Sequence, residues 1–395
     1  MALYAFDGTW QEGKAGDDPK FTNTNVFRFF ERYKKRSGTS DVYVPGIGTR
    51  FDAVGRALGG AFGIGELPRL LESYRSLCAN WANGDRVIDI VGFSRGAATT
   101  LDFCHIIQER GIRRPGTEEV VEASPQIRFL GVWDVVASFG LGNLGNEVLN
   151  IGHHLHLPKA NLQYCFHAMA LDERRPSFIN TRLPGACEVW FRGVHSDVGG
   201  GNGNRPLNDA ALRWMMCKAK AAGLPFDEAD IPQPVTAALQ PNASGKLPLK
   251  LRLISAVDRC HYTVAPLPEW ENPPDTCPRE TAADEQTAAE VGASGLVIQS
   301  DEERRRVLVL WETALDVAKA KDVSLDDVRE PLLSLFEGRI RLVTDDAKLL
   351  QGRQAVARLI TTAADGARVR GFHTLEPFFV TEALFAMPRV FPLTD

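Results

Sequence analysis

The residues with the clearest capacity for chemistry surround Ser94. Residues 87–98 read VIDIVGFSRGAA, an apolar run followed at once by the pattern Gly-x-Ser-x-Gly and by small residues. This order predicts a strand, a sharp turn and a helix, with the serine raised on the turn as a nucleophile. Gly92 and Gly96 would leave room for the strained turn, and the amide of Arg95 would donate to a developing oxyanion from the helix N-terminus. An ordinary glycine-rich turn is the alternative, and the flanking strand and helix favour the nucleophile.

A serine nucleophile needs a general base, usually a histidine that a carboxylate holds in the useful tautomer. In α/β-hydrolases the chain order is serine, acid, histidine. Asp134 directly follows the apolar run 127–133 and is our first choice for the acid. His195 lies in the glycine-rich segment 193–201, after a strand-like run, and is our first choice for the base.

Both assignments have alternatives. Asp134 could simply cap the next turn, which is a common role for an aspartate after a strand. The alternative acids are Asp172, Asp197 and Asp258. His261 follows a strand-like run at 251–257 and is the reserve base, whereas His167 falls in a helix predicted over 161–171 and is expected to be a packed residue.

Three other histidines raise the question of a metal. His153, His154 and His156 are close in sequence, but no cysteine or acidic partner stands at ligand spacing. We therefore expect a solvated loop there, no metal site and no cofactor.

The N-terminal segment 3–10 carries a second polar motif. Asp7, Gly8 and Thr9 follow a short apolar run, an order that resembles phosphotransferases with an aspartyl nucleophile, but the second aspartate expected two residues later is missing. We assign the amides of Gly8 and Thr9 to the second arm of the oxyanion hole, with Asp7 holding the turn. A plain turn and an Asp7-centred phosphotransferase are the alternatives.

The elements that must position these residues alternate between short apolar runs and longer amphipathic ones. Strands are predicted at 3–6, 41–44, 86–91, 127–133 and 188–191, and helices at 25–35, 67–83, 97–110, 161–171 and 208–222. This alternation predicts an α/β fold, an α/β-hydrolase-like, mostly parallel sheet flanked by helices, with ligands beyond the carboxyl ends of the strands.

Composition limits the function classes. With 395 residues, 44% of them hydrophobic, the chain can bury a large core, and a net charge of −5 gives no basic surface for nucleic acid. The seven cysteines form no C-x-x-C pair, so we expect reduced thiols and a protein that is cytoplasmic as synthesised. The N-terminus does not read as a signal peptide, and no apolar run approaches the roughly 18 residues that cross a bilayer, so we expect any membrane contact to be peripheral.

The composition changes near residue 266. We predict a catalytic domain over 1–265, a loop or linker rich in Pro, Glu, Ala and Thr over 266–300, and a mainly helical cap or docking region over 301–395. The glycine-rich, apolar segment 55–65 lacks the lysine of a phosphate-binding loop, and we interpret it as an apolar loop near the site or a tight packing connection.

Six motifs, taken in order, resemble a known family. They are residues 6–10, 45–49, 92–97, 132–134, 167–175 and 193–201. Over roughly 3–264 the chain is similar to the uncharacterised α/β-hydrolase domain family that includes phospholipase effectors of type VI secretion. The resemblance implies a triad of Ser94, Asp134 and His195, an ester or phospholipid substrate, delivery by a secretion system and an immunity protein as partner. A non-catalytic binding or toxin-accessory protein with the same fold is the alternative.

Overall fold

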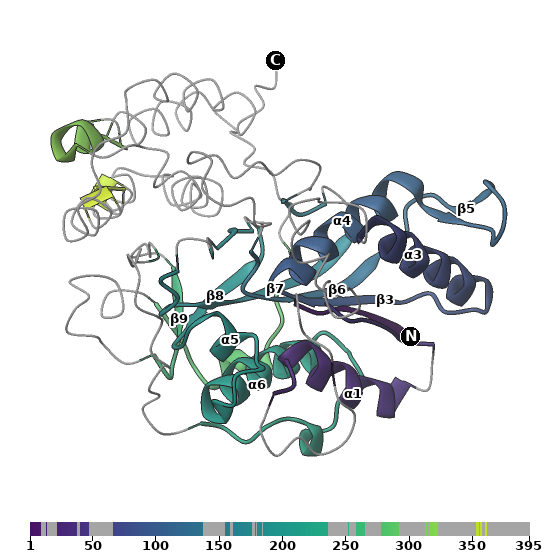
Figure 1. Ribbon diagram of the computed structural model, residues 1–395, viewed down its shortest axis with the longest axis horizontal. Coiled ribbons are helices and arrows are strands. Elements are labelled where there is room, and N and C mark those ends of the chain that lie inside the picture. Colours follow the sequence, from purple (N-terminus) through teal and green to yellow (C-terminus); the bar gives the residue numbers. More distant parts are fainter. Residues whose placement is uncertain are drawn as a thin grey trace, which may run out of the picture.

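The computed structural model is built on one eight-stranded sheet (Figure 1). Its strands are β1 (Ala2–Phe6), β2 (Val42–Val44), β3 (Ile88–Phe93), β6 (Ile127–Trp133), β7 (Leu162–Ala170), β8 (Cys187–Phe191), β9 (Arg259–His261) and β10 (Arg279–Glu280). They lie in the order β10, β9, β8, β7, β6, β3, β1, β2, and every pairing is parallel. The expectation of an α/β-hydrolase-like, mostly parallel sheet flanked by helices is confirmed.

The structure describes only part of the chain. The described residues are 1–8, 13, 22–37, 40–46, 66–136, 155–158, 161–175, 178, 180–183, 185–235, 252, 258–264, 278–291, 313–314, 316–322, 353–354, 356–357 and 360–361. The glycine-rich segment 55–65 lies outside them, as do His153, His154 and most of 266–395. The domain boundaries at 265 and 300 therefore remain predictions.

The strand order reverses beside β1. The chain runs from β1 to the edge strand β2 and then returns to β3 on the other side of β1. In open parallel sheets, ligands bind beyond the carboxyl ends of the strands at such a reversal. Asp7 directly follows β1 and Ser94 directly follows β3, so both lie at this point.

Helices cover both faces of the sheet (Figure 1). They are α1 (Asn25–Ser37), α3 (Glu66–Ala82), α4 (Arg95–Arg110), α5 (His195–Val198) and α6 (Arg205–Ala221). Side chains that alternate along β1 point to opposite faces. Leu3 and Ala5 pack in a core that includes α1 and α6, whereas Tyr4 and Phe6 pack in a second core with α3 and α4.

One predicted element is wrong. The helix expected over 161–171 is the strand β7, which lies between β6 and β8 near the middle of the sheet. Its last six residues are buried, so its apolar positions do not alternate. A strand covered on both faces reads as a continuous apolar run, and periodicity alone cannot separate it from a buried helix.

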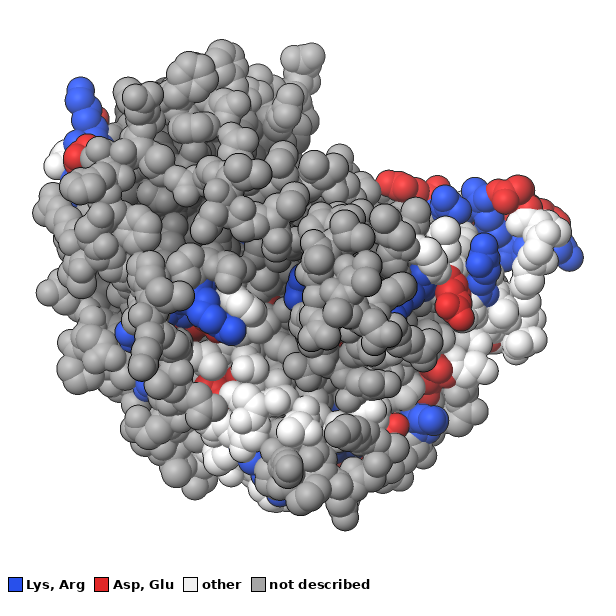
Figure 2. All heavy atoms as spheres, in the orientation of Figure 1, with Lys and Arg blue, Asp and Glu red and all other residues white. Residues whose placement is uncertain are grey.

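A small antiparallel hairpin, β4 (Ile112–Arg113) with β5 (Val120–Glu122), projects beyond α3 and α4 (Figure 1). Figure 2 shows basic and acidic side chains side by side on this projection, where Arg114 Nε and Glu119 Oε2 are 2.7 Å apart. The described charges there are of both signs. No helix among the described residues has the length and apolar character needed to cross a membrane.

Candidate active site

Ser94 lies in a sharp turn between β3 and α4. Its backbone angles are φ 58° and ψ −125°, outside the regions that L-residues normally occupy. Backbone hydrogen bonds hold this conformation: the Ser94 amide donates to Trp133 O at 3.0 Å, and the Ser94 carbonyl accepts from the amides of Ala97, Ala98 and Val136 at 3.1–3.4 Å. Backbone strain of this kind costs about 1–3 kcal/mol and persists only where the surroundings enforce it.

The two glycines that flank Ser94 are required by close contacts. A Cβ atom on Gly92 would lie 2.5 Å from Thr100 Cγ2 and 2.8 Å from Ala97 Cα. A Cβ atom on Gly96 would lie 2.4 Å from the carbonyl oxygens of both Phe6 and Asp7. Gly92 thus lets α4 pack closely on the end of β3, and Gly96 lets the start of α4 pack against the end of β1.

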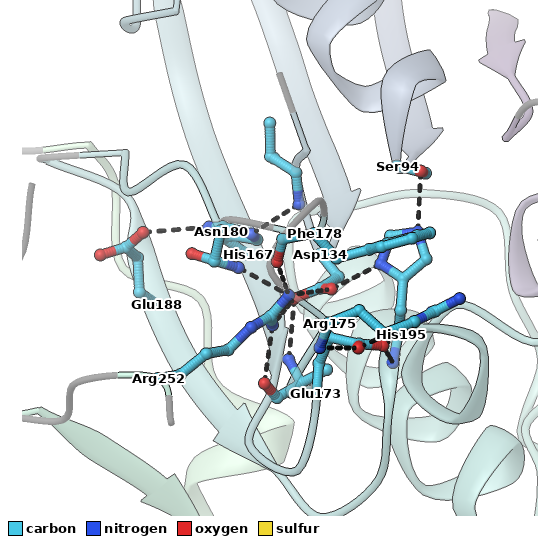
Figure 3. Close-up of polar contacts among 12 residues, drawn as sticks. Ser94, Asp134, His167, Glu173, Arg175, Phe178, Asn180, Glu188, His195 and Arg252 are labelled. Carbon is cyan, nitrogen blue, oxygen red and sulfur yellow. Dashed lines mark hydrogen bonds and ion pairs between the residues drawn. The ribbon is translucent and has the colours of Figure 1, made fainter. Parts of the chain in front are cut away.

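The structure brings together three of the predicted site residues (Figure 3). Ser94 Oγ is 2.7 Å from His195 Nε2, and His195 Nδ1 is 2.6 Å from Asp134 Oδ2. Ser94 follows β3, Asp134 follows β6, and His195 begins α5 just after β8. Since these strands are parallel, their carboxyl ends meet at one edge of the sheet. All three side chains are buried.

Asp134 sits in a dense set of donors. Its Oδ1 accepts hydrogen bonds from the Ala170 amide and from Asn180 Nδ2, both at 2.9 Å, and Arg252 donates to both of its oxygens. Burial by itself would raise the pKa of this carboxyl, but the charge of Arg252 and the hydrogen bond from His195 outweigh it, so the pKa lies below its ordinary value. Asp134 is therefore ionised at neutral pH and accepts a hydrogen bond from His195 Nδ1.

His195 is fixed on every side. Its ring centroid lies 4.6 Å from that of Phe93 and 4.8 Å from that of Phe178, and its amide donates to Glu173 Oε2 at 3.1 Å. Burial lowers the pKa of His195, and the hydrogen bond and charge of Asp134 offset this only in part. The imidazole is therefore neutral at pH 7, with Nδ1 protonated toward Asp134 and Nε2 able to accept the hydroxyl proton.

The turn after β1 lies against Ser94. A Cβ on Gly8 would lie 3.4 Å from Ser94 Cβ. The Gly8 amide donates to Asp7 Oδ1 at 2.7 Å, while Asp7 Oδ2 accepts from the hydroxyls of Thr24 and Tyr43, each at 2.6 Å. Burial raises the pKa of Asp7 to about 6, although these hydrogen bonds oppose the rise. Thr9, the other predicted donor, lies outside the described residues.

Comparison with known proteins identifies the family to which this chain belongs. Residues 3–124 and 113–218 match the family model "T6SS, Phospholipase effector Tle1-like, catalytic domain", which together is more than half of the chain. The chain belongs to this family. The crystal structure of an uncharacterized protein from Pseudomonas aeruginosa is similar to this Tle1-like chain at 19% identity, with a TM-score of 0.37. The match covers 98% of this chain and 65% of that one, so the chain spans slightly under two thirds of its length. Among curated proteins, no match was found.

The alternative residues of this Tle1-like domain are engaged elsewhere. His261 Nε2 is 2.9 Å from Glu285 Oε1, and its Nδ1 is 2.7 Å from Thr263 Oγ1, so neither ring nitrogen faces Ser94. The alternative acids have partners of their own: Asp172 pairs with Arg192, Asp258 pairs with Arg182, and Asp197 accepts from the Val194 amide. Within the described part of the chain, no group of His, Cys, Asp and Glu could hold a metal ion.

Two more residues shape the surroundings of Asp134. His167 is buried, as expected of a packed residue, but it stands on β7 and not in a helix. Its Nε2 accepts from the Val135 amide at 3.2 Å, and its Nδ1 is 3.0 Å from Glu188 Oε1. Arg252 lies 118 positions after Asp134 in the sequence. No local pattern marks it, because only the tertiary fold brings it to the acid.

Proposed function

We propose that this Tle1-like domain is a serine hydrolase that cleaves the carboxylic esters of phospholipids. Ser94 would be the nucleophile, His195 the general base and Asp134 the acid. The observation that carries the proposal is the unbroken path of hydrogen bonds from Ser94 Oγ through His195 to Asp134, at 2.7 and 2.6 Å. Membership in a family of phospholipase effectors supports a lipid as the substrate.

The reaction would begin when His195 Nε2 takes the proton of Ser94 as Oγ attacks the ester carbonyl. Asp134 would stabilise the imidazolium that forms, and the leaving alcohol would then receive this proton. Water would attack the acyl-enzyme with His195 as base, and His195 would then return the proton to Ser94 Oγ as the bond to the acyl group breaks and the fatty acid leaves. The protein groups in these steps, Ser94, His195 and Asp134, are already joined by hydrogen bonds.

Stabilisation of the oxyanion falls to backbone amides. The amide of Arg95, first residue of α4, would supply one donor at the positive end of the helix. The turn at Gly8 and Thr9 would supply the second. Since the Gly8 amide donates to Asp7 Oδ1, an oxyanion would have to compete with that carboxylate for the hydrogen bond from the Gly8 N–H. Loss of one such donor typically costs about 2.7–4 kcal/mol of transition-state stabilisation.

We further propose that the domain meets its substrate by peripheral membrane contact. Delivery by a type VI secretion system and neutralisation by an immunity protein accord with the family to which the chain belongs. We also propose that the protein is synthesised in the cytoplasm and that its reaction uses no cofactor. Residues 301–395 would serve as a cap or docking region.

A lipid panel tests the proposal. Purified protein is incubated with vesicles of defined phospholipids, and released fatty acids and lysolipids are resolved by mass spectrometry. We expect fatty acid release by the wild type and none by Ser94→Ala, with an unchanged thermal melt in the variant. Vesicle binding without any release would instead favour the binding or toxin-accessory protein. Magnesium-dependent phosphate transfer that survives Ser94→Ala would favour the Asp7-centred phosphotransferase.

A further inference from the structure

The buried guanidinium of Arg252 binds the carboxylate of Asp134, the acid of the proposed triad (Figure 3). Arg252 Nη1 donates to Asp134 Oδ1 at 2.5 Å, and Nη2 donates to Oδ2 at 2.9 Å. The Arg252 side chain is 7% exposed and that of Asp134 is fully buried. A two-pronged arginine–carboxylate pair fixes the plane of the carboxylate as well as its position.

The same guanidinium also binds two backbone carbonyls. Nη1 donates to Ala170 O, at the end of β7, at 2.7 Å, and Nη2 donates to Phe178 O at 2.9 Å. Phe178 is the residue whose ring packs against the imidazole of His195. Arg252 thus joins the acid to the segment that packs on the base.

The carboxylate of Asp134 is held in one orientation although its backbone is in an uncommon conformation. Its φ of 41° is in the left-handed region, which few residues other than glycine, asparagine and aspartate occupy. Its Oδ2 must lie within hydrogen-bond distance of His195 Nδ1 while Oδ1 accepts from Asn180 and the Ala170 amide. The guanidinium contacts both oxygens and so restrains rotation of the carboxylate.

We infer that Arg252 is a positioning residue, whose guanidinium holds the Asp134 carboxylate in the orientation that aligns His195 with Ser94. The inference rests on the proposed function, since it assigns a role around the same triad. Nothing in the serine motif or in the order of the triad requires an arginine at this place.

The positive charge has a second consequence that a merely structural role would not produce. Among the described residues, the charged groups that most affect the pKa of His195 are Asp134, Arg252 and Glu173, and Glu173 is itself paired with Arg175. Asp134 favours the protonated imidazole, and Arg252 opposes that effect. Removing the guanidinium would leave Asp134 with His195 as its remaining charged partner among the described residues, so the pKa of His195 would rise. The acid limb of kcat/KM would then move to higher pH.

The test compares pH profiles of kcat/KM on a soluble chromogenic ester. Arg252→Met removes the positive charge, and Arg252→Lys keeps the charge but loses the bidentate geometry of the guanidinium. The matched control is Arg182→Met, because Arg182 is also 7% exposed and binds Glu188 and Asp258. Far-UV circular dichroism and thermal melts report folding for each variant.

We expect Arg252→Met to move the acid limb upward by about one pH unit or more, the usual effect of a charge within a few ångströms. Its plateau should fall by on the order of 10–100-fold, because small displacements of reacting groups have effects of that size. Arg252→Lys should keep the limb near the wild-type pH but lose plateau activity. Arg182→Met should leave the limb where it is.

A folded Arg252→Met variant with the wild-type limb and plateau would overturn the inference. If that variant does not fold, Arg252→Lys decides, and a wild-type plateau there would be equally contradictory. Failure of the proposed function gives a different result, since wild type and Ser94→Ala would then hydrolyse the ester equally.

Discussion

Replacing Ser94 with glycine should stabilise the fold relative to replacing it with alanine. Both variants lose the hydroxyl, but alanine keeps the Cβ that is strained at φ 58° and ψ −125°. Relief of that strain is worth about 1–3 kcal/mol, and the greater freedom of glycine in the unfolded chain takes back about 0.4–1 kcal/mol. The net advantage of Ser94→Gly over Ser94→Ala is therefore roughly 0.5–2 kcal/mol.

Urea unfolding measures this difference as a shift in midpoint at constant slope. The control pair is Asp102→Gly and Asp102→Ala, inside α4. In a helical backbone the order is reversed, so Asp102→Gly should be less stable than Asp102→Ala by about 0.5–1 kcal/mol. Neither Ser94 variant should hydrolyse a chromogenic ester. If Ser94→Gly proves no more stable than Ser94→Ala while the Asp102 pair behaves as expected, the turn is not strained and our description of it fails.

Three further predictions concern Ser94 and the residues assigned to its site. Gly96→Ala places a Cβ 2.4 Å from the carbonyl oxygens of Phe6 and Asp7. The free energy of unfolding in urea should therefore fall by about 1–3 kcal/mol, and ester hydrolysis should be lost. A stable, active variant would contradict the close packing. At matched stability, His195→Ala should remove nearly all hydrolysis and His261→Ala very little, and the reverse result would reassign the base. Because the pKa of Asp7 is raised from 3.8 to about 6, its contribution to stability is full below 3.8 and is lost as the pH rises through 6. The stability of wild type relative to Asp7→Asn should therefore decline between pH 4 and pH 7 in urea unfolding, and a constant difference would show that Asp7 does not titrate in this range.

The sheet could be predicted from the sequence wherever a short apolar run ended in a turn. β1, β3, β6 and β8 fall within two residues of their predicted positions, because flanking Gly and Asp mark their ends. β7 was predicted as a helix, since burial on both faces removes the alternation that identifies a strand. The short β9 and β10 contain too few residues to show any period.

The candidate site was partly predictable for a related reason. Ser94, Asp134 and His195 each follow a strand end, so a parallel sheet brings them together without further information. Their hydrogen-bond contacts agree with the assignment, and their catalytic roles stay a proposal. Arg252 could not be found in this way, because its contact with Asp134 arises from tertiary packing and carries no local pattern. His167 was expected to be a packed residue, but its place on β7 beside Val135 follows only from the tertiary fold.

The most direct test of the central claim is to locate a covalent adduct. A fluorophosphonate reacts only with a serine whose hydroxyl is activated by a base, so the labelled protein is digested and its peptides are mapped by mass spectrometry. We expect one adduct, on Ser94, which is lost in Ser94→Ala and strongly reduced in His195→Ala. An adduct on a different residue, or ester hydrolysis that continues undiminished in Ser94→Ala, would contradict this claim.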